Sequence, residues 1–157
     1  EEMGKLKAVI TQNIDGLHQK AGSKKVLELH GSVHRNRCTH CHAFYDLSAM
    51  CAMQEGVPQC IKCGHTIKPE VVLYGEALDM SVVNEAISYL KAADLVIVGG
   101  TSLVVYPAAG LLQYAQGSHL VLINQSSTGI EDQAELVIHA PIAQVMETMM
   151  KQLSVDI

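Results

Sequence analysis

Three features are missing from this sequence, and each absence excludes a class of protein. No apolar run approaches the roughly 18 residues that a membrane-spanning helix needs, which excludes a transmembrane protein. The first residues, Glu1 to Lys5, have neither the charge nor the apolar stretch of a secretory signal peptide. Basic residues are few, because 11 Lys and Arg stand against 16 Asp and Glu, for a net charge of −5. An acidic chain repels phosphate unless its cations cluster, so general binding to nucleic acid is not expected.

The sequence does contain enough apolar residues for a core. It has 157 residues, of which 48% are hydrophobic and 17% are charged. A chain of this length suits one domain, or a core with one small appendage, and it can bury that core without disulfides. Intrinsic disorder is excluded, because disordered chains are poor in residues that can be buried.

The cysteines are the most informative residues. Four of the five form two pairs, Cys38-x-x-Cys41 and Cys60-x-x-Cys63, with 18 residues between the pairs. Each pair can turn two thiolates toward one ion, so two pairs complete the tetrahedral shell of a structural zinc site. Four protein ligands close that shell, so the zinc is not expected to take part in catalysis. A metal site without a targeting segment indicates a reducing compartment, the cytoplasm.

Other ligand sets remain open around these cysteines. A redox dithiol is one alternative to zinc, and His34, His40, His42 or His65 could replace a cysteine, although the symmetry of the pairs disfavours this. Cys51 is expected to be a loop or packing residue. Residues 34–70 are rich in cysteine, histidine and turn residues and show no helical periodicity. They are predicted to form a small, loop-rich zinc-binding module that needs the metal for stability.

Outside this module, short apolar segments alternate with amphipathic ones. The segments predicted to be strands are 6–10, 26–29, 94–98, 119–123 and 136–139. The predicted helices are a short one within 17–22, one with an apolar stripe from Val82 to Ala93, one from Pro107 to about Gln116 and one that starts at Pro141. This alternation predicts an α/β fold, a Rossmann-like parallel sheet with helices on both faces. Strand 94–98 is expected to be covered on both faces, and the Met-rich stripe of the last helix is expected to pack into the core.

Polar residues and glycines follow the predicted strands. Ligands bind at the carboxyl ends of the strands in parallel sheets, so this rim is the candidate site. His30 ends one strand and could act as a general base, although a structural histidine is the alternative. The turn at 99–102 could hold sugar or phosphate oxygens, and Asn124 could cap a helix or bind ribose. His18 and His119 are weaker candidates for the general base. The dinucleotide-binding fingerprint G-x-G-x-x-G is absent from the sequence.

Six segments, taken in this order, resemble the sirtuin family. They are Thr11 to His18 with Ala21-Gly22, Glu28 to Gly31, the two Cys-x-x-Cys pairs, Lys68 to Glu76, Gly100 to Leu103, and Ile123-Asn124. They are similar to the family's nicotinamide-pocket motif, its catalytic-histidine segment, its zinc module, its substrate-binding segment and its later nucleotide contacts. Together they span about residues 9 to 145, and local details resemble bacterial members.

The resemblance implies an NAD-dependent protein-lysine deacylase, most often a deacetylase. The acyl oxygen of the modified lysine attacks the nicotinamide ribose carbon as nicotinamide leaves, and His30 takes a proton from the ribose hydroxyl. The products are free lysine, nicotinamide and O-acyl-ADP-ribose. The residues implied to contact NAD are Gln12, Asn13, Asp15, Gly100, Thr101, Ser102, Asn124, Gln125, Ser126 and Ile142. The acyl-lysine peptide would add as a strand against Val71, Val72, Leu73, Tyr74, Gly75 and the segment near Val104.

Under this resemblance, residues 1–33 and 71–157 form a partial Rossmann-like NAD-binding domain, and residues 34–70 form the zinc module. One departure is large, because the family's GAG-type motif and its Arg-bearing cofactor loop are absent. The absent strand would lie between the strands that end at Asn13 and Val98, which leaves two strand edges unpaired. Met3 follows two acidic residues, so we expect the chain to be part of a longer protein. As a complete polypeptide, it is expected to fold poorly and to lack deacylase activity.

Two other function classes remain open. A mono-ADP-ribosyltransferase would use the same cofactor and would transfer ADP-ribose to a protein side chain or another nucleophile. A non-enzymatic zinc-bearing module could bind nucleic acid through the basic residues that flank the zinc cysteines, Arg35, Arg37, Lys62 and Lys68. The net charge of −5 and the lack of interleaved aromatic residues argue against this second class.

Overall fold

The computed structural model describes residues 1–53, 56–103, 106 and 108–153. The chain divides into two compact units, Glu1–Ala86 and Ile87–Ile157, and the boundary falls within helix α3 (Met80–Ala92). Val104, near which the sequence predicts a peptide contact, and Pro107, where it predicts a helix start, lie outside the described residues. No helix in the described part of the chain is long and apolar enough to cross a membrane.

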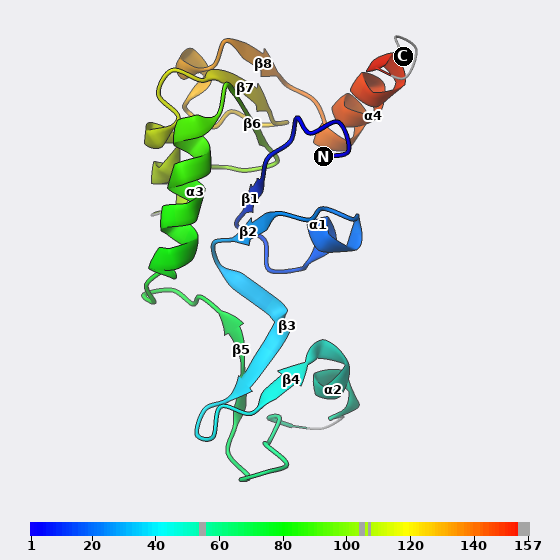
Figure 1. Ribbon diagram of the computed structural model, residues 1–157, viewed down its shortest axis with the longest axis vertical. Helices are drawn as coiled ribbons and strands as arrows, with labels where there is room; N and C mark the ends of the chain where they lie inside the picture. The colour runs from blue at the N-terminus through cyan, green and yellow to red at the C-terminus, as the bar shows by residue number, and fades with distance from the viewer. Residues whose placement is uncertain (54–55, 104–105, 107, 154–157) are drawn as a thin grey trace. The chain divides into compact units, whose positions relative to one another are not determined.

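The first unit begins with a small parallel sheet. Strands β1 (Val9–Thr11) and β2 (Val26–Glu28) pair in parallel, and the short helix α1 (Leu17–Lys20) lies between them in the sequence (Figure 1). These are the elements that the sequence predicts at 6–10, 17–22 and 26–29, with shifted ends. Helix α1 begins after Gly16, whose φ of 69° is a left-handed conformation that favours glycine.

An antiparallel sheet forms the rest of the first unit. It has the order β4-β3-β5, made of β3 (Gly31–Cys38), β4 (Phe44–Asp46) and β5 (Ile67–Val71), and helix α2 (Leu47–Ala52) follows β4. Asp46 caps α2 by accepting a hydrogen bond from the Ala49 N–H over 2.7 Å. Within the segment predicted to be loop-rich, strands and a helix thus occupy 34–38, 44–52 and 67–70, which the sequence analysis did not predict. The alternation was hidden because β4 is 3 residues long and a register shift interrupts the pairing of β3 with β5.

The second unit contains a parallel sheet of order β6-β7-β8. Its strands are β6 (Leu95–Gly99), β7 (His119–Ile123) and β8 (Leu136–Ile138), and helix α4 (Ile142–Leu153) follows them. These elements confirm the alternation that the sequence predicts. The segment after Pro107 is a 3₁₀ helix, Ala108–Tyr114, rather than an α-helix, and Gly110 in its middle lowers the α-helical propensity. A second short 3₁₀ helix spans Glu131–Gln133.

Two burial predictions are wrong in the second unit. In β6, Val98 is buried, but Leu95 and Ile97 are 53% and 41% exposed. Alternate residues of a strand point to opposite faces, so one face of β6 is covered and the other is not. The Met-rich stripe of α4 is not core either, since this helix has no buried residue. Helix α4 contacts the sheet through Ile142, whose side chain lies against Gly99, while Met149, Met150 and Leu153 are exposed.

The parallel strands form two sheets rather than one. Among the described residues, β1 pairs with β2 alone and β6 pairs with β7 alone. Neither β1 nor β6 therefore has a second paired strand among these residues.

Candidate functional sites

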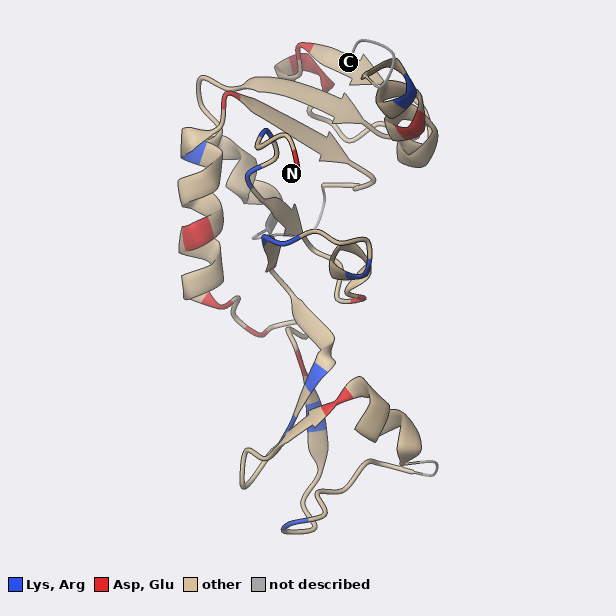
Figure 2. Cartoon of the chain, turned by 45° about the vertical axis from the view of Figure 1, so that its right-hand side comes forward, with Lys and Arg blue, Asp and Glu red and all other residues tan. Residues whose placement is uncertain are grey.

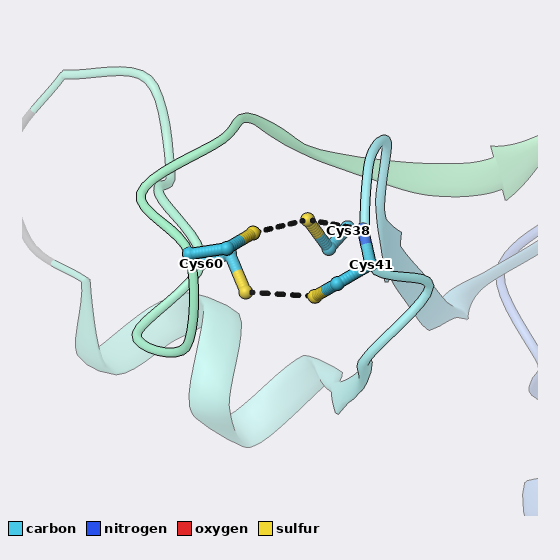
Figure 3. Close-up of side chains that lie close together, drawn as sticks. Cys38, Cys41 and Cys60 are labelled. Carbon is cyan, nitrogen blue, oxygen red and sulfur yellow. Dashed lines mark hydrogen bonds between the residues drawn. The ribbon is translucent and has the colours of Figure 1, made fainter.

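The four paired cysteines converge at one point in the first unit. Their Sγ atoms all lie within 4.8 Å of one another, and the Cys38–Cys63 and Cys41–Cys60 sulfur pairs are 3.4 Å and 3.5 Å apart. Figure 3 shows that the sulfur atoms point toward a common centre between two turns of the chain. Tetrahedral Zn²⁺ with Zn–S bonds of about 2.3 Å needs sulfur atoms about 3.8 Å apart. The four thiols are therefore positioned to bind a metal ion, consistent with a closed structural zinc site.

Tyr45 supports this cluster and was missed by sequence reasoning. Its hydroxyl donates to Cys60 Sγ over 3.1 Å and accepts from the Ile61 N–H over 3.0 Å. The hydrogen bond from Tyr45 lowers the pKa of the Cys60 thiol to about 6, which favours the thiolate that a metal requires. Tyr45 packs in a small core with Cys38, Cys60 and Ile67. No spacing rule links Tyr45 to Cys60, so only the fold identifies this contact.

Replacing Tyr45 with phenylalanine is expected to weaken zinc binding about tenfold, because outer-shell hydrogen bonds orient the ligands and stabilise their charge. The ring still fills the core, so the change in the free energy of unfolding of the metal-bound protein should stay near 1 kcal/mol. Competition with a chromophoric chelator measures the affinity. An unchanged affinity would contradict a supporting role for the hydroxyl.

The nearby histidines and the fifth cysteine do not join the cluster. His40 and His65 stack on each other, with ring centroids 4.2 Å apart, and His34 bonds to the Asp15 carbonyl instead. Cys51 lies on α2 and is exposed. Cys51 is thus an exposed helix residue, whereas the sequence predicted a loop or packing residue.

Charged side chains around the antiparallel sheet are largely paired. Arg35 lies 2.8 Å from Glu28 and 3.4 Å from Glu70, and Arg37 also pairs with Glu70. Lys68 lies 2.7 Å from Glu76. Figure 2 shows both basic and acidic residues in this sheet. Three of the four basic residues that could form a nucleic-acid patch are therefore neutralised by carboxylates.

His30 follows β2 and is held on both sides by backbone hydrogen bonds. The Leu29 N–H donates to the Thr11 carbonyl, and the Val72 N–H donates to the His30 carbonyl. The next residue, Gly31, has a φ of 75°, and a Cβ atom there would collide with the Glu70 carbonyl of β5. A glycine is needed after His30 for both reasons.

The imidazole ring of His30 is oriented by the Gln12 backbone. Nδ1 lies 2.9 Å from the Gln12 carbonyl oxygen. A carbonyl oxygen only accepts, so Nδ1 carries the proton, and in the neutral ring Nε2 keeps its lone pair. This arrangement can serve as a general base at Nε2.

The loop between β1 and α1 is shaped by its own side chains. The Thr11 hydroxyl accepts from the Asn13 N–H over 3.0 Å, and the Asp15 carboxylate accepts from the Leu17 N–H over 3.0 Å. Gln12 is half-buried, whereas Asn13 and Asp15 are exposed. The structure thus brings Gln12 to His30 through its backbone and leaves two predicted polar side chains open to solvent.

A pocket of about 320 Å³ lies at the carboxyl ends of β6 and β7 in the second unit. Its lining is polar or glycine and consists of Gly100, Thr101, Ser102, Asn124, Gln125, Ser126 and Ser127. Six of these residues are predicted site residues, and Ser127 is the addition. Ile142 is not among them, since its side chain lies against Gly99. A small polar pocket of this size can hold the sugar and phosphate parts of a nucleotide.

Glu131 organises the loop beside this pocket. Its carboxylate accepts from the Thr128 N–H over 2.6 Å, from the Ser127 hydroxyl over 2.8 Å and from the Gly129 N–H over 2.9 Å. These hydrogen bonds, the Thr128 N–H first, lower the pKa of Glu131 to about 2. The Thr-x-x-Glu spacing of 128–131 is the sequence signal that could have identified this turn.

The segment predicted to bind the substrate peptide leaves β5 as an exposed turn. Val71 pairs with Gly31, and the Glu76 carboxylate closes the turn by accepting from Lys68 and from the Leu73 N–H. Those hydrogen bonds, with Lys68 first, lower the pKa of Glu76. Leu73 and Tyr74 are exposed in this turn, so apolar surface is available for a partner.

The chain is similar in sequence to proteins of one family. A family model described as "Sir2 family" matches residues 1–107. The NAD-dependent protein deacetylase of Clostridium perfringens (strain 13 / Type A) is 59% identical over 147 residues, which cover 93% of this chain and 60% of that protein. The NAD-dependent protein deacetylase of Clostridium acetobutylicum is 54% identical over 149 residues, covering 95% of this chain and 61% of that protein. The chain therefore spans about three fifths of the length of these curated relatives.

Solved structures agree with this similarity. A structure described as "Sir2-p53 peptide-NAD+" matches with a TM-score of 0.91 and 40% identity, over 98% of this chain and 66% of that chain. A structure described as "Sir2 bound to acetylated peptide" matches with a TM-score of 0.91 and 39% identity, also over 98% and 66%.

Proposed function

Because this chain belongs to the Sir2 (sirtuin) family, we propose that the protein containing it is an NAD-dependent protein-lysine deacylase. The proposed reaction transfers the acyl group of an acyl-lysine to ADP-ribose and releases nicotinamide. Two relatives, 54% and 59% identical, carry the name NAD-dependent protein deacetylase. Structures of similar chains are described with NAD, an acetylated peptide or a propionylated peptide. These names support a deacylase acting on protein lysines.

The observation that carries the proposal is the hydrogen bond between His30 Nδ1 and the Gln12 carbonyl. It keeps the proton on Nδ1, so Nε2 can accept a proton. NAD, when bound, supplies the ADP-ribosyl group that accepts the acyl group as nicotinamide leaves. His30 Nε2 would take the proton from the ribose hydroxyl. The nearby residues Gln12, Asn13 and Asp15 would contact the nicotinamide ribose.

The pocket residues of the second unit are proposed to bind the other end of NAD. Gly100, Thr101 and Ser102, then Asn124, Gln125 and Ser126, offer backbone N–H groups, hydroxyls and amides for phosphate and ribose oxygens. We propose a backbone contact from Ile142 to adenine. Its side chain is partly taken up by contact with Gly99, which leaves the backbone for that role.

The acyl-lysine peptide is proposed to add as a strand along Val71 to Gly75. The exposed Leu73 and Tyr74 and the turn closed by Glu76 support this placement. No membrane partner is proposed. No nucleic-acid partner is proposed either, since three of the four basic residues near the zinc cysteines, Arg35, Arg37 and Lys68, are paired with carboxylates.

We propose the domain limits that the sequence predicts, with residues 34–70 as the zinc module and residues 1–33 and 71–157 as the NAD-binding part. The four cysteines would hold Zn²⁺ for a structural purpose, because they fill its tetrahedral shell. We also propose that the protein works in the cytoplasm, where thiols that are not in disulfides persist.

Incubation of the full protein that contains this chain with an acetyl-lysine peptide and NAD tests the proposed function. We expect deacetylated peptide, nicotinamide and O-acetyl-ADP-ribose in equal amounts, measured by mass spectrometry. ADP-ribose attached to a protein, without deacetylated peptide, would replace the proposal with a mono-ADP-ribosyltransferase. An absence of NAD consumption would reject both enzymes.

A further inference from the structure

A bulge in β3 lies beside the loop that follows β1. The register of β3 against β5 shifts between Ser32 and Asn36. Within this bulge, the Val33 N–H donates to the Ile14 carbonyl over 3.0 Å, and His34 Nε2 lies 2.9 Å from the Asp15 carbonyl. Because the carbonyl only accepts, Nε2 of His34 carries a proton and donates it to this hydrogen bond.

The His34 ring also packs directly on this loop. A Cβ atom at Gly16 would lie 2.7 Å from both Cδ2 and Nε2 of His34, closer than such atoms can approach. The ring therefore fills the space that a side chain at position 16 would need, where the backbone turns into helix α1. One side chain thus holds both the Asp15 carbonyl and the Gly16 backbone.

The loop from Gln12 to Gly16 has two attachments outside itself that involve histidine rings. Near its start, the Gln12 carbonyl accepts from His30, and near its end, the Asp15 carbonyl accepts from His34. When the second attachment is lost, the His30 ring still holds the start of the loop and the Val33 N–H still holds the Ile14 carbonyl, but the backbone at Asp15 and Gly16 loses its contact with His34. The conformation of Asn13 and Asp15 then becomes less restricted, and ordering the loop on binding costs free energy.

We propose that His34 is a positioning residue that holds the Gln12–Gly16 loop in the conformation that binds the nicotinamide ribose. The inference rests on the proposed NAD-dependent function. His34 touches the loop backbone and not the reacting atoms, so it should act on NAD binding more than on the chemical step.

Two variants of the full gene product that contains this chain separate the hydrogen bond from simple packing. His34→Leu keeps a side chain of similar size but has no donor, whereas His34→Gln keeps an N–H donor at a similar reach. For His34→Leu we expect the KM for NAD to rise about fivefold, with kcat changed by less than about twofold. For His34→Gln we expect a KM for NAD near that of the wild type, and for both we expect an unchanged peptide KM.

Amide hydrogen exchange tests the positioning role without relying on activity. In His34→Leu, exchange should become about fivefold faster at Leu17 and Lys20, whose N–H groups bond to Asp15 and Gly16. The amides of the zinc module should keep their rates. Equal KM and equal exchange in His34→Leu and the wild type would overturn the proposal, as would equal defects in the Leu and Gln variants. An inactive wild type would reject the proposed function alone, because the exchange result stands by itself.

Discussion

Replacing His30 with alanine is expected to lower kcat of the proposed deacylase by a factor of about 10² to 10⁴, the usual range for loss of a general base. The physical reason is the oriented ring, because Nδ1 donates to the Gln12 carbonyl and Nε2 is left to take a proton. Removing the ring deletes the proton acceptor but leaves the backbone hydrogen bonds of Leu29 and Val72 in place. Initial rates at saturating NAD and acetyl-lysine peptide measure the effect.

A matched histidine gives the control for this prediction. His119 is exposed at the amino end of β7, where it pairs with Glu135, so His119→Ala should keep the wild-type kcat. The free energy of unfolding of His30→Ala should fall only by what loss of one hydrogen bond costs, about 1 kcal/mol. If His30→Ala retains more than about a tenth of the activity, another group is the base.

Replacing Cys38 with serine is expected to abolish zinc binding and to unfold the antiparallel sheet β4-β3-β5. Cys38 is 1% exposed and packs with Tyr45, Cys60 and Ile67 in a core too small to stand alone. Structural zinc supplies about 10 to 16 kcal/mol to folding in small zinc domains, so its loss exceeds what this core can offset. Activity should disappear as well, because β3 begins at the residue after His30, and Val72, directly after β5, donates its N–H to the His30 carbonyl.

Cys51 offers the control within the same module. It is exposed on α2 and outside the cluster, so Cys51→Ser should keep one equivalent of zinc and full activity. Metal analysis, the melting temperature and circular dichroism distinguish the two variants. A strong chelator should reproduce the Cys38→Ser result in the wild type. A folded, active, zinc-free protein would contradict a structural role for the metal.

Features carried by neighbouring residues were predictable from the sequence. The cysteine spacing identified the four thiols that meet in space, because each Cys-x-x-Cys turn orients its own two sulfur atoms. The apolar segments at 94–98 and 119–123 predicted parallel strands, since strand periodicity is local. Six predicted residues after these strands line one pocket, because the carboxyl ends of neighbouring parallel strands lie together.

Features that depend on distant contacts were not predictable. Leu95 and Ile97 were predicted to be core residues, but they are exposed. Apolar character alone does not say whether another element covers that face of the strand. The prediction that the Met-rich face of α4 is buried is wrong for the same reason. The strands of 34–70 were missed because short pairings and a bulge leave no alternation to detect.

The family, the four cysteines that converge and the order of the elements outside residues 34–70 follow from the sequence alone, because motifs and periodicities are properties of adjacent residues. Only the tertiary structure shows that His30 Nδ1 donates to the Gln12 carbonyl, that Tyr45 supports Cys60 and that His34 holds the Asp15 carbonyl. Each of these contacts joins residues 15 to 19 positions apart through a hydrogen bond. Such bonds depend on distances of about 3 Å between elements, which no local pattern encodes.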